Sequence, residues 1–242
     1  MQSFKEYLLK EGSWKDNFEF WPRRDILDWV AKNGHRVLKK YNISDFQIGA
    51  IAEGWPDANG IVNPRSVNLV DCAECLPKIN ETEFRHFPCQ FGKVDGSFFV
   101  VRCDLGSLKG SPKIVGGRYS ISNNYAITSI EYLPEQAGSY ILRNTSIKSF
   151  SGINKVIKRV TSTSEGFIML PSSTESALLG FLKIPGLQEL RLSTVVQHQG
   201  KAVSKELITA VNIVNSHLAA TKDTIACQRE LIENDLDEYA EF

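Results

Sequence analysis

Residues 94–150 decide the fold, because one short pattern of glycine, aromatic and apolar residues occurs in them three times. The copies read Val94-Asp95-Gly96-Ser97-Phe98-Phe99-Val100, Val115-Gly116-Gly117-Arg118-Tyr119-Ser120-Ile121 and Ala137-Gly138-Ser139-Tyr140-Ile141-Leu142. Gly96, Gly117 and Gly138 follow one another at equal intervals. Their spacing lies in the range of about 20–29 residues that is typical of leucine-rich repeats. The sequence therefore predicts stacked turns of near-equal length, with a glycine at a tight corner of each.

Each copy continues in a pattern that is typical of a short strand followed by an inward turn. The matches are Phe98-x-Val100-x-x-Cys103, Tyr119-x-Ile121-x-x-Asn124 and Tyr140-x-Leu142-x-x-Thr145. Because side chains alternate along a strand, we expect Phe98, Tyr119 and Tyr140 to point inward in one column. An Asn or Thr at the turn position is expected to bond the backbone of neighbouring turns.

Weaker copies of the pattern flank the three good ones. Val67-x-Leu69-x-x-Cys72 precedes them, and Leu190-x-Leu192-x-x-Val195 follows them. Residues 156–171 match poorly, so we expect an irregular turn or two there. The alternative for the whole region is an antiparallel β domain whose hairpins recur with the same period.

Both ends of the chain show helical signals. Apolar residues share one helical face within residues 4–8, and a second short helix is predicted over residues 22–34, from a proline to a glycine. Residues 46–48 and residues 60–62 are predicted to form strands. Near the other end, Ser204 and Asp223 are the predicted N-caps of two further helices.

These signals together predict an α+β protein, built as a leucine-rich-repeat-like β-solenoid of about 21-residue turns with helical caps. An N-terminal helical cap is expected at residues 1–45, the degenerate solenoid at residues 46–200 and a C-terminal helical cap at residues 201–242. Caps are expected because the first and last turns of a stack otherwise expose an apolar face.

The composition argues against several broad classes of protein. In 242 residues, 28 Lys and Arg balance 28 Asp and Glu, so no global basic field attracts nucleic acid or an acidic membrane. No apolar run is long enough to span a bilayer, and no secretory signal is expected at the start. Five cysteines are an odd set, which favours a reducing cytosol over secretion.

The cysteines are the first candidates for chemistry. Cys72-x-x-Cys75 is half of a zinc or redox motif, which Cys89, Cys103 or His86 would have to complete. No second Cys-x-x-Cys pair follows, and a small thiol at the inward turn position simply packs. His86 and Cys89 lack an orienting carboxylate at a recognisable spacing. We therefore predict no catalytic residues, no metal site and no cofactor.

The outward positions of the repeat are the candidate binding site. A stack of turns presents a wide and shallow surface, which suits recognition of a protein better than small-molecule chemistry. Between residues 102 and 160, nine Lys or Arg outnumber three acids. Tyr119 and Tyr140 are expected to point inward, so nucleic acid, which needs a stacking platform, is the less favoured partner. The predicted protein-binding residues are Phe99, Val101, Arg118, Ser120, Ile141 and Arg143.

The run Phe91-Gly92-Lys93-Val94-Asp95-Gly96-Ser97-Phe98 is followed by Leu105-Gly106-Ser107-Leu108-Lys109-Gly110-Ser111-Pro112-Lys113. With the start at residues 3–8 and the end at residues 225–240, the chain resembles a family of uncharacterised leucine-rich-repeat-like proteins of large tailed bacteriophages. The resemblance implies a phage-encoded protein and supplies no catalytic residues. We expect a non-enzymatic factor that binds a host or phage protein in the host cytoplasm. The alternative is a structural or assembly protein of the virion.

Overall fold

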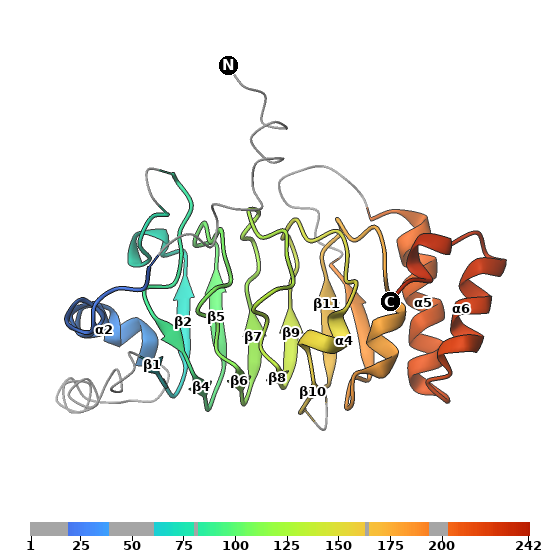
Figure 1. Cartoon of the computed structure of the whole chain (residues 1–242), viewed down its shortest axis with the longest axis horizontal. Coiled ribbons are helices and arrows are strands. Elements are labelled where there is room, and N and C mark those ends of the chain that lie inside the picture. The colour runs from blue at the N-terminus through green and yellow to red at the C-terminus, as the bar shows by residue number, and fades with distance from the viewer. Residues whose placement is uncertain (1–18, 39–60, 80–81, 163–164, 194–202) are drawn as a thin grey trace, which may run out of the picture.

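The computed structural model describes residues 19–38, 61–79, 82–162, 165–193 and 203–242. Two predicted elements, the helix at residues 4–8 and the strand at residues 46–48, lie outside these ranges. Within them, the chain forms an elongated row of parallel strands with helices at both ends (Figure 1). None of the helices in these ranges is long and apolar enough to cross a membrane.

A parallel sheet of six strands forms the centre of the protein. Its strands are β2 (Val67–Val70), β5 (Phe98–Val101), β7 (Arg118–Ser120), β9 (Ser139–Ile141), β11 (Phe167–Leu170) and β12 (Glu189–Leu192). They lie in the order β12-β11-β9-β7-β5-β2. β-Branched and aromatic residues are frequent in these strands, which favours an extended backbone with one buried face.

Two further parallel sheets contain only two-residue strands. The four-stranded sheet has the order β10-β8-β6-β4 and contains β4 (Lys93–Val94), β6 (Ile114–Val115), β8 (Gln136–Ala137) and β10 (Arg159–Val160). The third sheet pairs β1 (Ile61–Val62) with β3 (Gln90–Phe91). In each of the three good copies, the strand before the glycine joins the four-stranded sheet and the strand after it joins the six-stranded sheet.

The predicted fold class is wrong: the protein is not an α+β leucine-rich-repeat-like β-solenoid. It is a mixed α/β protein whose parallel strands are divided among sheets of six, four and two strands. The sequence pattern missed the strands before the glycines, because two residues are too short to show a periodicity. Paired residues are also unevenly spaced, since Val67 and its partner Phe98 lie further apart in the chain than Phe98 and its partner Tyr119. The antiparallel alternative is wrong too, since every pair of described strands is parallel.

The inward column of aromatic rings is confirmed. Phe98 pairs with Tyr119, and Tyr119 pairs with Tyr140. All three side chains are fully buried, with ring centroids 5.5 Å and 6.1 Å apart along the column. Both tyrosine hydroxyls are hydrogen-bonded, as buried polar groups require. Because neighbouring residues of a strand face opposite sides, this column also fixes which side chains point outward.

Asn124 occupies the inward turn position and joins two adjacent copies of the repeat. Its Oδ1 accepts hydrogen bonds from the backbone N–H groups of Cys103 at 3.1 Å and Leu105 at 3.0 Å. Its Nδ2 donates to the carbonyl oxygens of Val100 and Ile121, both at 2.8 Å. Because Val100, Cys103 and Leu105 belong to the preceding copy, the prediction that an Asn here bonds a neighbouring turn is confirmed.

Threonine at the same position behaves differently. The hydroxyl of Thr145 donates to the carbonyl of Leu142 at 2.8 Å, inside its own turn. After β11, Thr174 makes the same bond to Pro171 at 2.8 Å. The prediction that a threonine here bonds a neighbouring turn is therefore wrong for Thr145, and both threonine side chains stabilise single turns.

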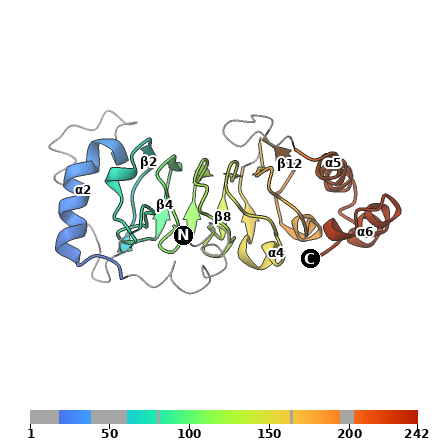
Figure 2. The same cartoon turned by 90° about the horizontal axis from the view of Figure 1, so that it is seen from above.

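Helix α2 (Arg23–Leu38) packs against β2 at one edge of the six-stranded sheet (Figures 1 and 2). Its buried side chains Ile26, Trp29 and Val30 belong to the central core. The helix continues to Leu38, past the end predicted at Gly34, because glycine weakens a helix interior without breaking it.

Helix α5 (Lys205–Ala219) packs against β12 at the opposite edge, and α6 (Thr224–Glu233) packs against α5. Both predicted N-caps are confirmed. Ser204 accepts a hydrogen bond from the backbone of the first turn of α5, and Asp223 does the same for α6. The short helices are η2 (Ala73–Cys75), α4 (Ile153–Val156), η3 (Leu179–Lys183) and η4 (Asp237–Tyr239).

Candidate functional site

The outer face of the six-stranded sheet brings together the predicted binding residues. We define it by two rows of side chains that point away from the aromatic column. In strand register, the middle row consists of Asn68, Phe99, Ser120, Ile141, Met169 and Arg191. Two residues further along each strand, the end row consists of Val70, Val101, Ser122, Arg143, Pro171 and Ser193. The sixth predicted residue, Arg118, lies on the same side at the start of β7.

Exposure separates Ser120 from the other predicted residues. Ser120 is only 3% exposed, and its hydroxyl lies 3.0 Å from that of Ser122, so this pair is satisfied below the surface. The remaining predicted residues reach the surface: Arg118 is exposed, and Phe99, Val101, Ile141 and Arg143 are partly buried. Among the predicted residues, the surface of this face is therefore formed by apolar side chains and arginines rather than by the serine.

A groove of about 520 Å³ lies beside the start of these strands. Phe99 and Arg118 line it, together with Glu165 and several glycines and serines. A side chain on Gly116 would place its Cβ 2.0 Å from the carbonyl oxygen of Asp95, so this corner admits glycine alone. Glycine at this corner lets the backbones of adjacent turns approach each other closely.

Ion pairs neutralise two of the arginines near this face. Arg118 pairs with Glu165 at 2.9 Å across the groove, and Arg191 pairs with Glu189 at 2.7 Å. The guanidinium of Arg191 also lies 4.0 Å from the ring centroid of Phe167, a cation–π distance. Arg143, by contrast, has no ion pair within the described residues.

Sequence reasoning missed Met169, Arg191 and Glu165. Residues 156–171 were expected to be irregular, but they include the well-paired strand β11. A usable signal was present in Ile168-x-Leu170, which matches the apolar positions of the repeat. Its polar turn residue, Thr174, comes one position later than Thr145 does in its own copy, and Pro171 directly follows the strand. Glu165 carried no signal of its own, since its partner Arg118 is 47 residues away in the chain.

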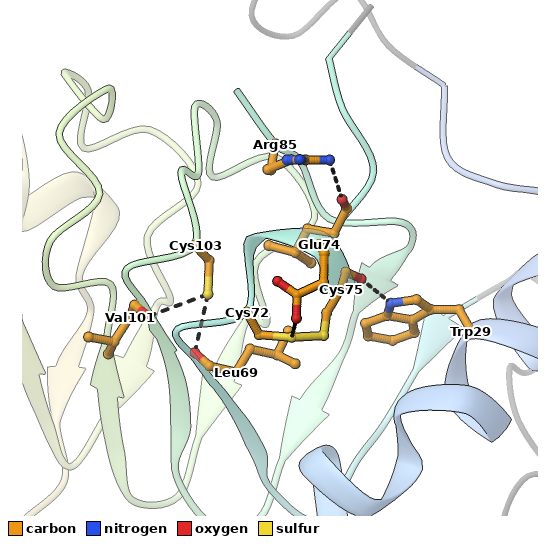
Figure 3. Close-up of a disulfide and its surroundings, with 9 residues drawn as sticks. Trp29, Leu69, Cys72, Glu74, Cys75, Arg85, Val101 and Cys103 are labelled. Atoms are coloured by element: carbon orange, nitrogen blue, oxygen red, sulfur yellow. Dashed lines mark hydrogen bonds between the residues drawn. A yellow bond between two sulfur atoms is a disulfide. The ribbon is translucent and has the colours of Figure 1, made fainter. Parts of the chain in front are cut away.

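Cys72 and Cys75 form a disulfide across the short turn η2 (Figure 3). Within the described ranges, one cluster of side chains has the residue types and spacing of a metal site. It consists of Cys72, Glu74 and Cys75, whose potential ligand atoms all lie within 4.8 Å of one another. Sulfur binds metals as a thiolate, so neither sulfur is available as a ligand while the disulfide is intact. The expectation that Cys72 packs as a free thiol is therefore wrong, and the reason is the short distance that η2 leaves between the two cysteines.

Cys103 is a buried free thiol next to this disulfide (Figure 3). Its sulfur lies 3.4 Å from the carbonyl oxygens of both Leu69 and Val101. Burial raises the pKa of Cys103 to about 11. At neutral pH it is a protonated, packed side chain, as predicted for a thiol at the inward turn position.

His86 and Cys89 were the other candidates for thiol chemistry. Burial lowers the pKa of His86, and its Nδ1 lies 2.7 Å from the carbonyl oxygen of Phe87. Burial raises the pKa of Cys89 well above its usual range and that of Cys227 to about 12. Both thiols are protonated at neutral pH, and a protonated thiol is a poor nucleophile.

Comparisons with known proteins identify no relative. No family model matches the chain, and no curated protein or solved structure matches it either. The chemistry of the outer face and its groove is therefore the strongest indication of function.

Proposed function

We propose that this protein is a non-enzymatic binding module that engages another protein through its outer face. The observation that carries the proposal is the middle row, in which Ile141 and Met169 are neighbours in register and Phe99 follows beyond Ser120. All three apolar side chains are partly exposed. A solvated sheet face normally carries polar residues at these alternating positions. Adjacent exposed apolar side chains on a soluble protein mark an interaction site.

The geometry of the sheet supports recognition of a protein surface. Strands lie about 4.8 Å apart, so six of them span about 24 Å, a width comparable to a standard protein interface. The backbone that carries Phe99 and Ile141 is held by the buried column of Phe98, Tyr119 and Tyr140. A surface fixed in this way loses little conformational freedom when a partner binds.

The resemblance to phage proteins supports a phage factor that acts on a host or phage protein in the host cytoplasm. A second candidate is a structural or assembly protein of the virion. Helix α6 favours it, because Ile225 and Ile232 are 69% and 48% exposed and lie two turns apart on one helical face. Mass spectrometry of purified particles separates the two, since an infection factor is absent from the virion whereas an assembly component is stoichiometric.

Site-specific photo-cross-linking tests the proposed outer face. A photoreactive amino acid is placed at Phe99 or Ile141, and in a matched control at Ile114, which is 38% exposed on the four-stranded sheet. The three variants are expressed in infected cells, irradiated, purified and analysed by mass spectrometry. We expect one protein to be cross-linked from Phe99 and from Ile141 and not from Ile114. Identical products from all three positions, or none from the outer face, would contradict the proposal.

A further inference from the structure

Two polar atoms in the end row of the outer face are buried without a hydrogen-bond partner. They are Nε of Arg143 and Oγ of Ser193. In the described part of the chain, one other buried side-chain atom has no hydrogen-bond partner, namely Nε of Arg85. Its guanidinium does make a hydrogen bond through Nη1, which donates to a carbonyl oxygen 3.2 Å away. Nearly all buried polar groups in folded proteins have a partner. Ser193 is buried, whereas Arg143 as a whole is partly exposed, so Arg143 is the unsatisfied side chain that a partner can contact.

Strand register places these two donors at the same level of the sheet. Ile141 pairs with Met169, and Leu170 pairs with Leu192, so Arg143, Pro171 and Ser193 follow side by side. Two strand spacings separate the Cα atoms of Arg143 and Ser193 by about 10 Å. Pro171 between them is buried and has no side-chain hydrogen-bonding group that could pair with either donor.

The charges around the outer face favour an anionic ligand at Arg143. The carboxylates of Glu165 and Glu189 are already paired with Arg118 and Arg191. Among the described residues, none of the ion pairs includes Arg143. Its guanidinium thus contributes an unneutralised positive charge in a partly buried position, where an ionic hydrogen bond is stronger than in water.

We infer that the end row is a carboxylate-binding site, at which Arg143 receives an Asp or Glu side chain of the protein partner. The inference rests on the proposed function and specifies the chemistry of the partner. A guanidinium binds a carboxylate through two parallel N–H···O bonds. Ile141 lies two residues before Arg143 on the same face, and Val101 lies two strands away in the end row, so we expect apolar residues near the acidic residue of the partner to contact them.

Selection of random peptides on the full chain tests this inference directly. The peptides that bind best are synthesised, together with versions in which Asn and Gln replace Asp and Glu. Their affinities are measured for the natural protein, for Arg143→Gln and for the control Arg159→Gln. Arg159 is a matched control because it is exposed on β10 of the four-stranded sheet. Arg143→Lys, which keeps the charge and loses the planar pair of donors, is a second, milder variant for the event that Arg143→Gln fails to fold.

We expect the selected peptides to share an acidic residue next to apolar ones. Removing that acid, or introducing Arg143→Gln, is expected to weaken binding by about 10- to 100-fold, the effect of losing a charged hydrogen-bonded pair. Arg143→Lys is expected to weaken it by about 5-fold, and Arg159→Gln by less than about 2-fold.

Other results overturn the inference in distinguishable ways. Peptides without an acid that bind Arg143→Gln normally would overturn the carboxylate site and leave the proposed function standing. Peptides that bind equally well after Phe99→Asp and Ile141→Asp, or a selection that yields none, would contradict the proposed function itself. Binding of oligothymidylate that is lost in Arg143→Gln would assign the end row to nucleic acid instead.

Discussion

Replacing Asn124 by alanine tests whether one buried amide holds two adjacent copies of the repeat together. The side chain is fully buried and makes four hydrogen bonds of 2.8–3.1 Å. Truncation leaves the backbone N–H groups of Cys103 and Leu105 buried without an acceptor. Each orphaned group costs about 1–3 kcal/mol, so these two donors alone lower the free energy of unfolding by about 2–6 kcal/mol. We expect a loss of about 4 kcal/mol, a large part of the stability of a typical domain.

Urea unfolding followed by circular dichroism and tryptophan fluorescence measures this loss. Thr145→Ala is the matched control, because Thr145 occupies the same position one copy later and makes a single bond within its own turn. We expect this control to lose only about 1 kcal/mol. Asn124→Asp retains the acceptor but places a buried carboxylate oxygen next to the carbonyl oxygens of Val100 and Ile121, so a loss at least as large as that of Asn124→Ala is expected. A loss below about 1.5 kcal/mol for Asn124→Ala, or one equal to that of the control, would refute the role of the amide.

Three further predictions concern thiol burial, the sheet edge and a glycine corner. The free energy of unfolding should fall as the pH rises from about 9 to about 11. The reason is that the Cys103 thiol ionises near its ordinary pKa of 9.0 in the unfolded chain but at about 11 in the folded protein. A difference of two pKa units corresponds to about 2–3 kcal/mol. Asn215→Ala should speed amide hydrogen exchange in β12, because the Asn215 amide bonds both the N–H and the carbonyl of Leu190, at 2.7 Å and 2.8 Å. Gly116→Ala should lower the melting temperature, because its Cβ would lie 2.0 Å from the Asp95 carbonyl oxygen and overpacking costs about 1–3 kcal/mol.

Each of these predictions has a result that contradicts it. Cys103→Ala should show a smaller alkaline loss than the natural protein, and superimposable pH curves would exclude the thiol as a cause. In Asn215→Asp, which keeps one of the two hydrogen bonds, the amides of β12 should exchange at an intermediate rate. Unchanged exchange in both variants would show that the Asn215 amide does not stabilise this edge strand. A Gly116→Ala variant that melts like the natural protein would show that the corner relaxes freely.

The repeated pattern allowed the two faces of the central strands to be predicted. Alternation along a strand is a local property, and the equal intervals from Phe98 to Tyr119 and on to Tyr140 set their register. For that reason, the inward column and the outward positions Phe99 and Ile141 followed from sequence alone.

The fold class and the full site could not be predicted in this way. The two-residue strands of the four-stranded sheet carry no periodic signal, so the division into separate sheets was not visible. The interval from Tyr140 to its partner Ile168 is longer than the preceding two and contains the helix α4, which breaks the period and hid Met169. The pairing of Arg118 with Glu165 depends on a tertiary contact between residues that are distant in the chain. This pairing leaves Arg143 as the unpaired cation of this face among the described residues.

The affinity of the double variant Phe99→Asp, Ile141→Asp for the protein cross-linked at Phe99 tests most directly whether the sheet buries one face and presents the other to a partner. We predict that binding weakens by at least about 100-fold, as for the loss of interface hot spots. The melting temperature should stay within about 5 °C of that of the natural protein, whereas Phe98→Asp, at a fully buried position, should prevent folding. Unchanged affinity, or a double variant that unfolds as Phe98→Asp does, would show that these side chains are not a binding surface.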